Sequence, residues 1–152
     1  MINHLPIFGS LIGGFVVVYG LVSKSSETKL AAYYVVVLSA VGAIIAYMTG
    51  EAAEGTVEHL QGISKSMLEQ HEDASVFALV ALIILGIASL IGAILTIKKS
   101  TYSKSVAMVI LFIALISFGI IARTGHLGGQ IRHTELSNTT PAHNDNEHHD
   151  HD

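Results

Sequence analysis

The chain has 152 residues, of which 51% are hydrophobic and 13% are charged. That composition is too apolar for an ordinary soluble domain of this length. The chain contains no cysteine, which excludes disulfides, thiolate metal sites and iron–sulfur clusters held by its own cysteines.

Four apolar blocks without Asp, Glu, Lys, Arg or His follow one another, at about residues 5–22, 30–48, 74–97 and 106–122. A bilayer core about 30 Å thick requires roughly 20 residues of helix, and lipid offers no other partner to the backbone. We therefore predict an all-α transmembrane bundle of four up-and-down helices over residues 1–136. Residues 137–152 are polar and without periodicity, so a disordered tail is expected there. The first block is expected to remain as a helix, because residues 1–4 lack the positive charge of a signal peptide.

Small residues in the first two blocks predict close helix packing. Gly9 and Gly13 are spaced four apart, which suits a close approach within the bundle or docking to another membrane protein. The second block has a similar face, made of Ser39, Gly42, Ala43, Ala46 and Gly50. Tyrosines near its two ends are expected at the membrane interfaces: Tyr33, Tyr34 and Tyr47.

The connection after the second block predicts a short helix from Glu51 to Leu60, which Gly62 ends. Ser64 then caps a new helix that runs through His71 into the third block. On this helix the face of His71 continues with small and polar residues, which predicts that it lines the bundle interior: Ser75, Ala78, Leu82, Leu85, Ser89, Gly92 and Thr96. His71 should therefore point inward at the mouth of the bundle.

After the fourth block, Gly128-Gly129 predicts a sharp reversal that folds residues 123–136 back over the same mouth. Together with the connection from Gly50 to Asp73, this segment would form a cap on the bundle.

The charges predict the orientation in the membrane. The two short connections carry five lysines and one acid, whereas the other side carries three basic and eleven acidic residues. Lysine and arginine near helix ends mark the cytoplasmic side. We expect a multi-pass protein of the inner (plasma) membrane with both termini outside, in the periplasm if the source is bacterial.

All nine histidines fall on the predicted outer side, and four of them belong to the tail. The tail histidines could bind Zn²⁺, Ni²⁺ or Cu²⁺ loosely. The other five stand at or near the bundle mouth: His4, His59, His71, His126 and His133. Imidazole is the commonest metal ligand, and neighbouring carboxylates act as further ligands or fix the tautomer.

Two kinds of site fit these residues. In the first, His4 and His71 hold a haem b, with His133 as a substitute and Arg123 and Arg132 on the propionates. In the second, a divalent transition-metal ion is bound by histidines and carboxylates drawn from His59, His71, His133, Glu54, Glu58, Glu72 and Glu135. The remaining alternative is that these residues only cap helices at the interface.

Other function classes have little support. No metalloprotease, nucleophile-elbow or phosphate-loop motif is present, so we do not expect the chain to be an enzyme by itself. No acid lies within a predicted span, which argues against an acid-lined ion pathway. The lipid bilayer is the expected environment, and no nucleic-acid partner is expected.

Several motifs resemble a group of small uncharacterised bacterial membrane proteins of the domain-of-unknown-function type. They are His4-Leu5-Pro6-Ile7, Tyr47–Glu54, Val57-Glu58-His59, His71-Glu72 and Thr124–Glu135, within about residues 4–136. The resemblance implies a membrane domain, and distant relatives joined to Rieske-type ferredoxin domains hint at electron transfer. Relatives often carry Asn at the position of His126, which leaves His4, His59, His71 and His133 as the better candidates.

The sequence therefore leads to three functional hypotheses. The first is electron transfer through haem b on the outer face, with a redox partner. The second is binding or handling of a Zn, Fe, Cu or Ni ion. The third is a structural subunit of a larger membrane complex or a homo-oligomer, docked through the face of Gly9 and Gly13.

Overall fold

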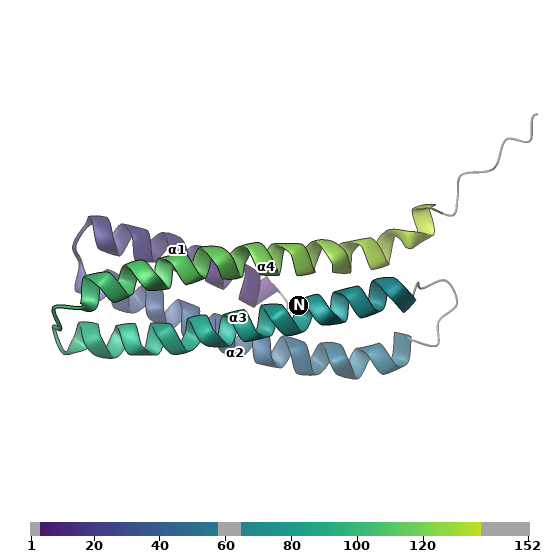
Figure 1. The fold of residues 1–152 in the computed structure, drawn as a ribbon, viewed down its shortest axis with the longest axis horizontal. Coiled ribbons are helices and arrows are strands. Elements are labelled where there is room, and N and C mark those ends of the chain that lie inside the picture. The colour runs from purple at the N-terminus through teal and green to yellow at the C-terminus, as the bar shows by residue number, and fades with distance from the viewer. Residues whose placement is uncertain (1–3, 58–64, 138–152) are drawn as a thin grey trace, which may run out of the picture.

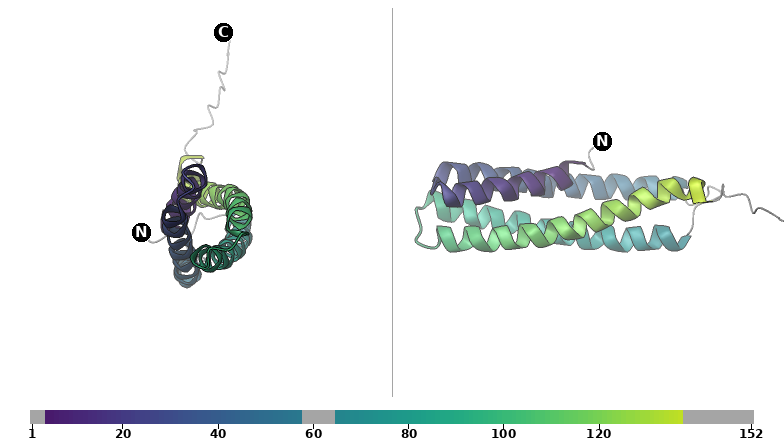
Figure 2. Two further views of the ribbon diagram at one scale, coloured as in Figure 1. Left: turned by 90° about the vertical axis from the view of Figure 1, so that its left-hand side faces the viewer. Right: turned by 90° about the horizontal axis from the view of Figure 1, so that it is seen from above.

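Four α-helices form an up-and-down bundle in which each helix packs against the next and α1 closes the ring on α4 (Figures 1 and 2). They are α1 His4–Val22, α2 Ser26–Val57, α3 Lys65–Ile97 and α4 Ser103–Ser137. The computed structural model describes residues 4–57 and 65–137, with side chains for 4–50 and 69–129. The predicted disordered tail, the Ser64 cap and the break at Gly62 lie outside the described residues.

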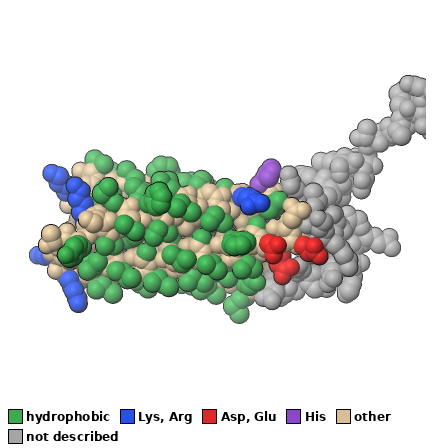
Figure 3. Space-filling view, viewed as in Figure 1, with side chains coloured by type: hydrophobic (Ala, Val, Ile, Leu, Met, Phe, Trp, Pro, Cys, Tyr) green, Lys and Arg blue, Asp and Glu red, His purple; other side chains and the backbone are tan. Residues whose placement is uncertain are grey.

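The surface of the bundle is apolar around its middle, as a membrane-spanning protein requires. All four helices are long and apolar enough to cross a bilayer, over His4–Val22, Ser26–Gly50, Glu69–Ile97 and Ser103–Gly129. Figure 3 shows the hydrophobic belt with lysines at one end and acids toward the other. We call these the lysine end, formed by the connections 23–25 and 98–102, and the histidine end, which carries His4, His71 and His126. The predicted four-helix membrane architecture is confirmed.

The connections at the lysine end are tight and alike. Lys24 and Lys99 adopt left-handed backbone conformations, with φ of 53° and 51°. The amide of Lys99 donates to Thr96 and that of Ser100 to Leu95, which satisfies the last carbonyls of α3 in a Schellman motif. Ser25 then caps α2 by accepting a hydrogen bond from the amide of Thr28, at 3.2 Å.

Two helices extend further than the sequence predicted. α2 continues through Gly50 to Val57, and α4 continues through Gly128 and Gly129 to Ser137. The predicted reversal at Gly128-Gly129 is therefore wrong, and residues 123–136 do not fold over the mouth. A glycine inside a helix costs only about 1 kcal/mol. Continued helix hydrogen bonding offsets that cost, and at Gly128 so does packing against His71 of α3.

The inward face of α3 agrees with the prediction. Leu82, Leu85, Ser89 and Thr96 are buried, and the remaining core also comes mostly from small or branched residues of the other helices. The face of Gly9 and Gly13 is turned inward as well. A Cβ at Gly9 would overlap Ser39, and one at Gly13 would overlap the Val36 side chain. These glycines therefore serve α1–α2 packing, and the hypothesis that they dock a partner is wrong.

Tyr33 is a core residue and not an interfacial one. It is fully buried, and its ring lies against Gly92, where a Cβ would stand 3.1 Å from Cζ. Its neighbour Tyr34 is exposed, as predicted for an interfacial tyrosine. The difference arises because Tyr33 falls on the inward stripe of α2, together with Ala32 and Val36.

The histidine end is less closed than the lysine end. α1 has 19 residues, whereas α2, α3 and α4 have 32, 33 and 35. The three longer helices therefore continue beyond the start of α1, as Figures 1 and 2 show. Any site at this end must be built chiefly from α2, α3 and α4.

Candidate functional site

His71 lies at the mouth of the histidine end, on the inward side of α3. The residue is half-buried, and its Nδ1 atom is fully buried with no hydrogen-bond partner among the side chains that the structure describes. Its ring packs on Gly128 of α4, where a Cβ would stand 3.0 Å from Cε1 and 3.5 Å from Nδ1. The prediction that His71 points inward is confirmed, and Gly128 supplies the space for its imidazole.

A hydrogen bond between α3 and α4 holds this contact in register. The Thr124 hydroxyl lies 3.0 Å from the Ala74 carbonyl of α3 and 3.1 Å from the Ile120 carbonyl of its own helix. Ala74 follows His71 by one turn, and Thr124 precedes Gly128 by one turn. The polar anchor therefore sits directly beneath the imidazole on both helices.

Helix register places the backbone of Glu54 level with His71. The Cβ of Ala40 would lie 2.7 Å from a Cβ at Gly86, so these positions of α2 and α3 are opposite each other. Glu54 and His71 stand fourteen and fifteen residues from that contact toward the histidine end, or about 21–22 Å of helix rise. Glu54 is also about three turns beyond the buried Ala43, and so on the inward face of α2.

The last turns of α4 add further candidates by register. Arg132 and Glu135 stand four and seven residues beyond Gly128, which puts their backbone positions on nearly the same helix face. His133 stands five residues beyond Gly128 and is turned away by about 140°. The side chains of all three, and that of Glu54, lie outside the described part of the structure.

His4 is not brought together with His71. It is exposed at the start of α1, where its ring lies 6.1 Å from that of Phe8. His4 stands eighteen residues from the lysine end of α1, whereas His71 stands twenty-six residues from the lysine end of α3. At the rise of an α-helix, the two positions differ along the bundle axis by about 12 Å. Because α1 and α3 run in the same direction, both side chains tilt the same way and do not close this gap.

The other predicted residues are dispersed or fall outside the described residues. Glu72 and Arg123 are exposed, on α3 and α4, and so is His126. Glu58 and His59 lie outside the described residues, as do the tail histidines. Among the side chains that the structure describes, no three His, Asp or Glu residues form a group that could hold a metal ion.

The chain was compared with models of known protein families. A model described as "Predicted membrane protein (DUF2231)" matches residues 1–139. The chain belongs to the DUF2231 family. No curated protein and no solved structure matches it. For this DUF2231 member the comparisons thus agree with the resemblance in its motifs and with an integral membrane protein.

One polar group was missed by sequence reasoning. Lys29 is one of the five lysines counted in the two short connections, yet it lies in α2, is 8% exposed, and its Nζ donates a hydrogen bond to Ser103 at 3.1 Å. The signal was present, because Lys29 shares its helix stripe with Ala32, Tyr33 and Val36.

Proposed function

We propose that this protein holds a transition-metal cofactor at the histidine end, with His71 as the ligand that the bundle positions. The supporting observation is the buried Nδ1 of His71, which has no partner among the described residues. A buried polar atom left unpaired costs about 1–3 kcal/mol. A neutral imidazole nitrogen can be satisfied by a metal ion instead of a hydrogen-bond donor.

The arrangement favours a divalent ion over haem b. Glu54 shares the level and the inward face of His71. Glu135 shares the face of Gly128 but stands about 10 Å farther along α4, so it is the less suited carboxylate. One imidazole with carboxylates is a donor set that suits Zn²⁺, Fe²⁺ or Mn²⁺. The proposed role is binding or handling of such an ion on the membrane surface.

Haem b electron transfer is the second form of this proposal. It would use His71 as one axial ligand, with Arg132 or Arg123 on the propionates. His133, the substitute ligand, is turned about 140° away from Gly128 on α4, which weakens this form of the proposal. The pair of His4 and His71 is less suited, because the two residues differ in level by about 12 Å. A redox or membrane-complex partner would then approach the histidine end.

Elemental analysis tests the proposal on the full-length protein with the four tail histidines replaced by alanine. We expect about one metal ion per chain, a loss of more than about tenfold in His71→Ala, and no change in His4→Ala. A haem would appear as a band in the reduced-minus-oxidised spectrum. Retention of the metal by His71→Ala would contradict the assignment.

A pair of glycine variants tests the same assignment without replacing His71, in case His71→Ala does not fold. Gly128→Val places a side chain against the imidazole, whereas the position of Gly129 has no heavy atom within 4 Å. Gly128→Val should therefore release metal and Gly129→Val should retain it. Equal metal content in the two variants would argue that the imidazole is not a ligand.

We also propose that the lysine end faces the cytoplasm, because lysines gather there beside a single acid, Glu27. The chain has no cysteine, so single cysteines report the topology cleanly. In intact cells a membrane-impermeant maleimide should label Glu72→Cys and should label Thr101→Cys only after the membrane is opened. Both residues are exposed, and the opposite labelling pattern would reverse the orientation.

A further inference from the structure

Lys29 is a buried cation at the lysine end without an acidic partner in the described residues. Its Cγ packs against Gly20 of α1, where an added Cβ would be only 2.8 Å away. Its Nζ donates a hydrogen bond to Ser103 at the start of α4. The side chain therefore crosses from α2 to a place between α1 and α4. Glu27, the acid nearest in sequence, is exposed.

The groups around Lys29 are hydroxyls, which leaves its charge uncompensated. Ser103 lies 2.8 Å from the Thr96 hydroxyl, and the buried Tyr33 hydroxyl, one turn along α2, faces Thr96 as well. An ammonium has three donors, and burying a charge without a counter-ion is costly. An anion that reached this point would supply both the missing charge and the missing acceptors.

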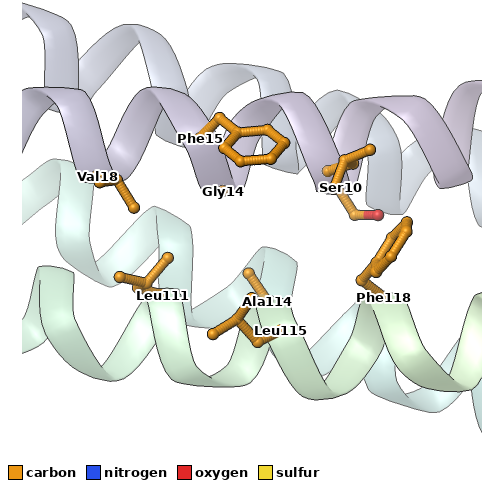
Figure 4. A pocket seen from close by; sticks show the side chains of 9 residues that line it. Ser10, Gly14, Phe15, Val18, Leu111, Ala114, Leu115 and Phe118 are labelled. Carbon is orange, nitrogen blue, oxygen red and sulfur yellow. The ribbon is translucent and has the colours of Figure 1, made fainter.

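An apolar groove runs along the same seam between α1 and α4. Its volume is about 140 Å³, and it is open on one side. Its lining includes Phe15 and Val18 of α1 and Leu111, Leu115 and Phe118 of α4 (Figure 4). Ser10 is its polar member, and that hydroxyl already donates to the Ile7 carbonyl at 3.0 Å. A dry apolar cavity of about this size holds a benzene molecule, so the groove has room for several methylene groups.

The groove lies deeper in the membrane than the buried lysine and begins within about one turn of it. Val18 and Ser10 stand four and twelve residues from Val22, which is about 6 Å and about 18 Å of helix rise. One leaflet of a bilayer has about 15 Å of hydrocarbon. Nearer the lysine end, the Lys29 side chain runs from its contact with Gly20 of α1 to its hydrogen bond with Ser103 of α4.

We propose that the α1/α4 seam binds one anionic phospholipid from the leaflet at the lysine end. An acyl chain occupies the groove, and the headgroup phosphate lies by Lys29 and Ser103. The exposed Lys24 and Lys104 at the same end add to the attraction for a negative headgroup. Basic pockets between transmembrane helices are a recurring way to recognise such lipids.

Native mass spectrometry of the full-length protein tests this site in micelles that contain equal phosphatidylglycerol and phosphatidylcholine. We expect one phosphatidylglycerol to be retained, with a preference of about fivefold or more, as one lysine near the membrane provides. Lys29→Met keeps the length of the side chain and should reduce the preference to about twofold or less. Because Met suits an apolar interior, this variant is expected to remain folded.

Two sets of control variants distinguish specific lipid binding in the seam from nonspecific attraction to surface lysines. Lys24→Met removes an exposed charge and should preserve most of the preference, whereas Val18→Trp should fill the groove and reduce retention of both lipids. Val22→Trp changes the same residue type outside the groove and should have no effect. The proposal is overturned if Lys24→Met acts as strongly as Lys29→Met, or if Val18→Trp leaves retention unchanged.

Discussion

Gly20→Ala is expected to destabilise the bundle by about 1–3 kcal/mol, because α1 and α2 approach too closely here for a side chain. A Cβ would stand 3.0 Å from the backbone nitrogen of Lys29 and 3.3 Å from its Cα. Backbone atoms cannot move aside as a flexible side chain can, so the helices must separate. Unfolding in mixed detergent micelles, followed by circular dichroism, measures the loss.

Gly119→Ala is the matched control for this prediction. Gly119 also lies inside a helix, but no heavy atom lies within 4 Å of the position of its Cβ. Alanine there should be neutral or stabilising by up to about 1 kcal/mol, since it removes only the entropy cost of glycine. Similar stability changes in the two variants would show that the helices do not meet at Gly20.

Leu85→Ala is expected to cost about 2 kcal/mol of unfolding free energy. Leu85 is 0% exposed at the centre of the bundle. In a membrane, lipid is as apolar as the core, so the loss comes mainly from the cavity and the missing packing contacts. Unfolding in the same micelles should show the change directly.

Leu90→Ala tests whether burial in the bundle, and not leucine itself, carries this stability. Leu90 lies on the same helix but is 48% exposed to the surrounding lipid. Its truncation should cost less than about 0.5 kcal/mol, in the range of surface substitutions. A cost equal to that of Leu85→Ala would argue against the inward face assigned to α3.

The candidate site was only partly predictable. The helical period predicted that His71 lies on the inward face. Every third or fourth residue from Ser75 to Thr96 is small, polar or a core leucine, and His71 continues this pattern. Its partner could not be found in this way, because Gly128 was interpreted as a turn. Glycine has no side chain, so only the approach of α3 shows that it makes room for an imidazole.

The positions of residues along the bundle axis also could not be predicted from the sequence. His4 and His71 both belong to the histidine end, but the difference in length between α1 and α3 separates them by about 12 Å. Lys29 shows the same limit at the other end. The sequence placed Lys29 in a connection between helices, whereas its place on the inward stripe of α2 buries it against α1 and α4.

By itself, the sequence determined that this chain is a four-helix membrane protein, because lipid admits backbone only as long apolar helices or closed barrels. It also determined which face of α3 turns inward, because a helix repeats every 3.6 residues. Only the tertiary structure decided how far α2 and α4 extend, which glycines meet which side chains, and which polar groups share one level. Those features depend on contacts between helices far apart in the sequence, which no local pattern records.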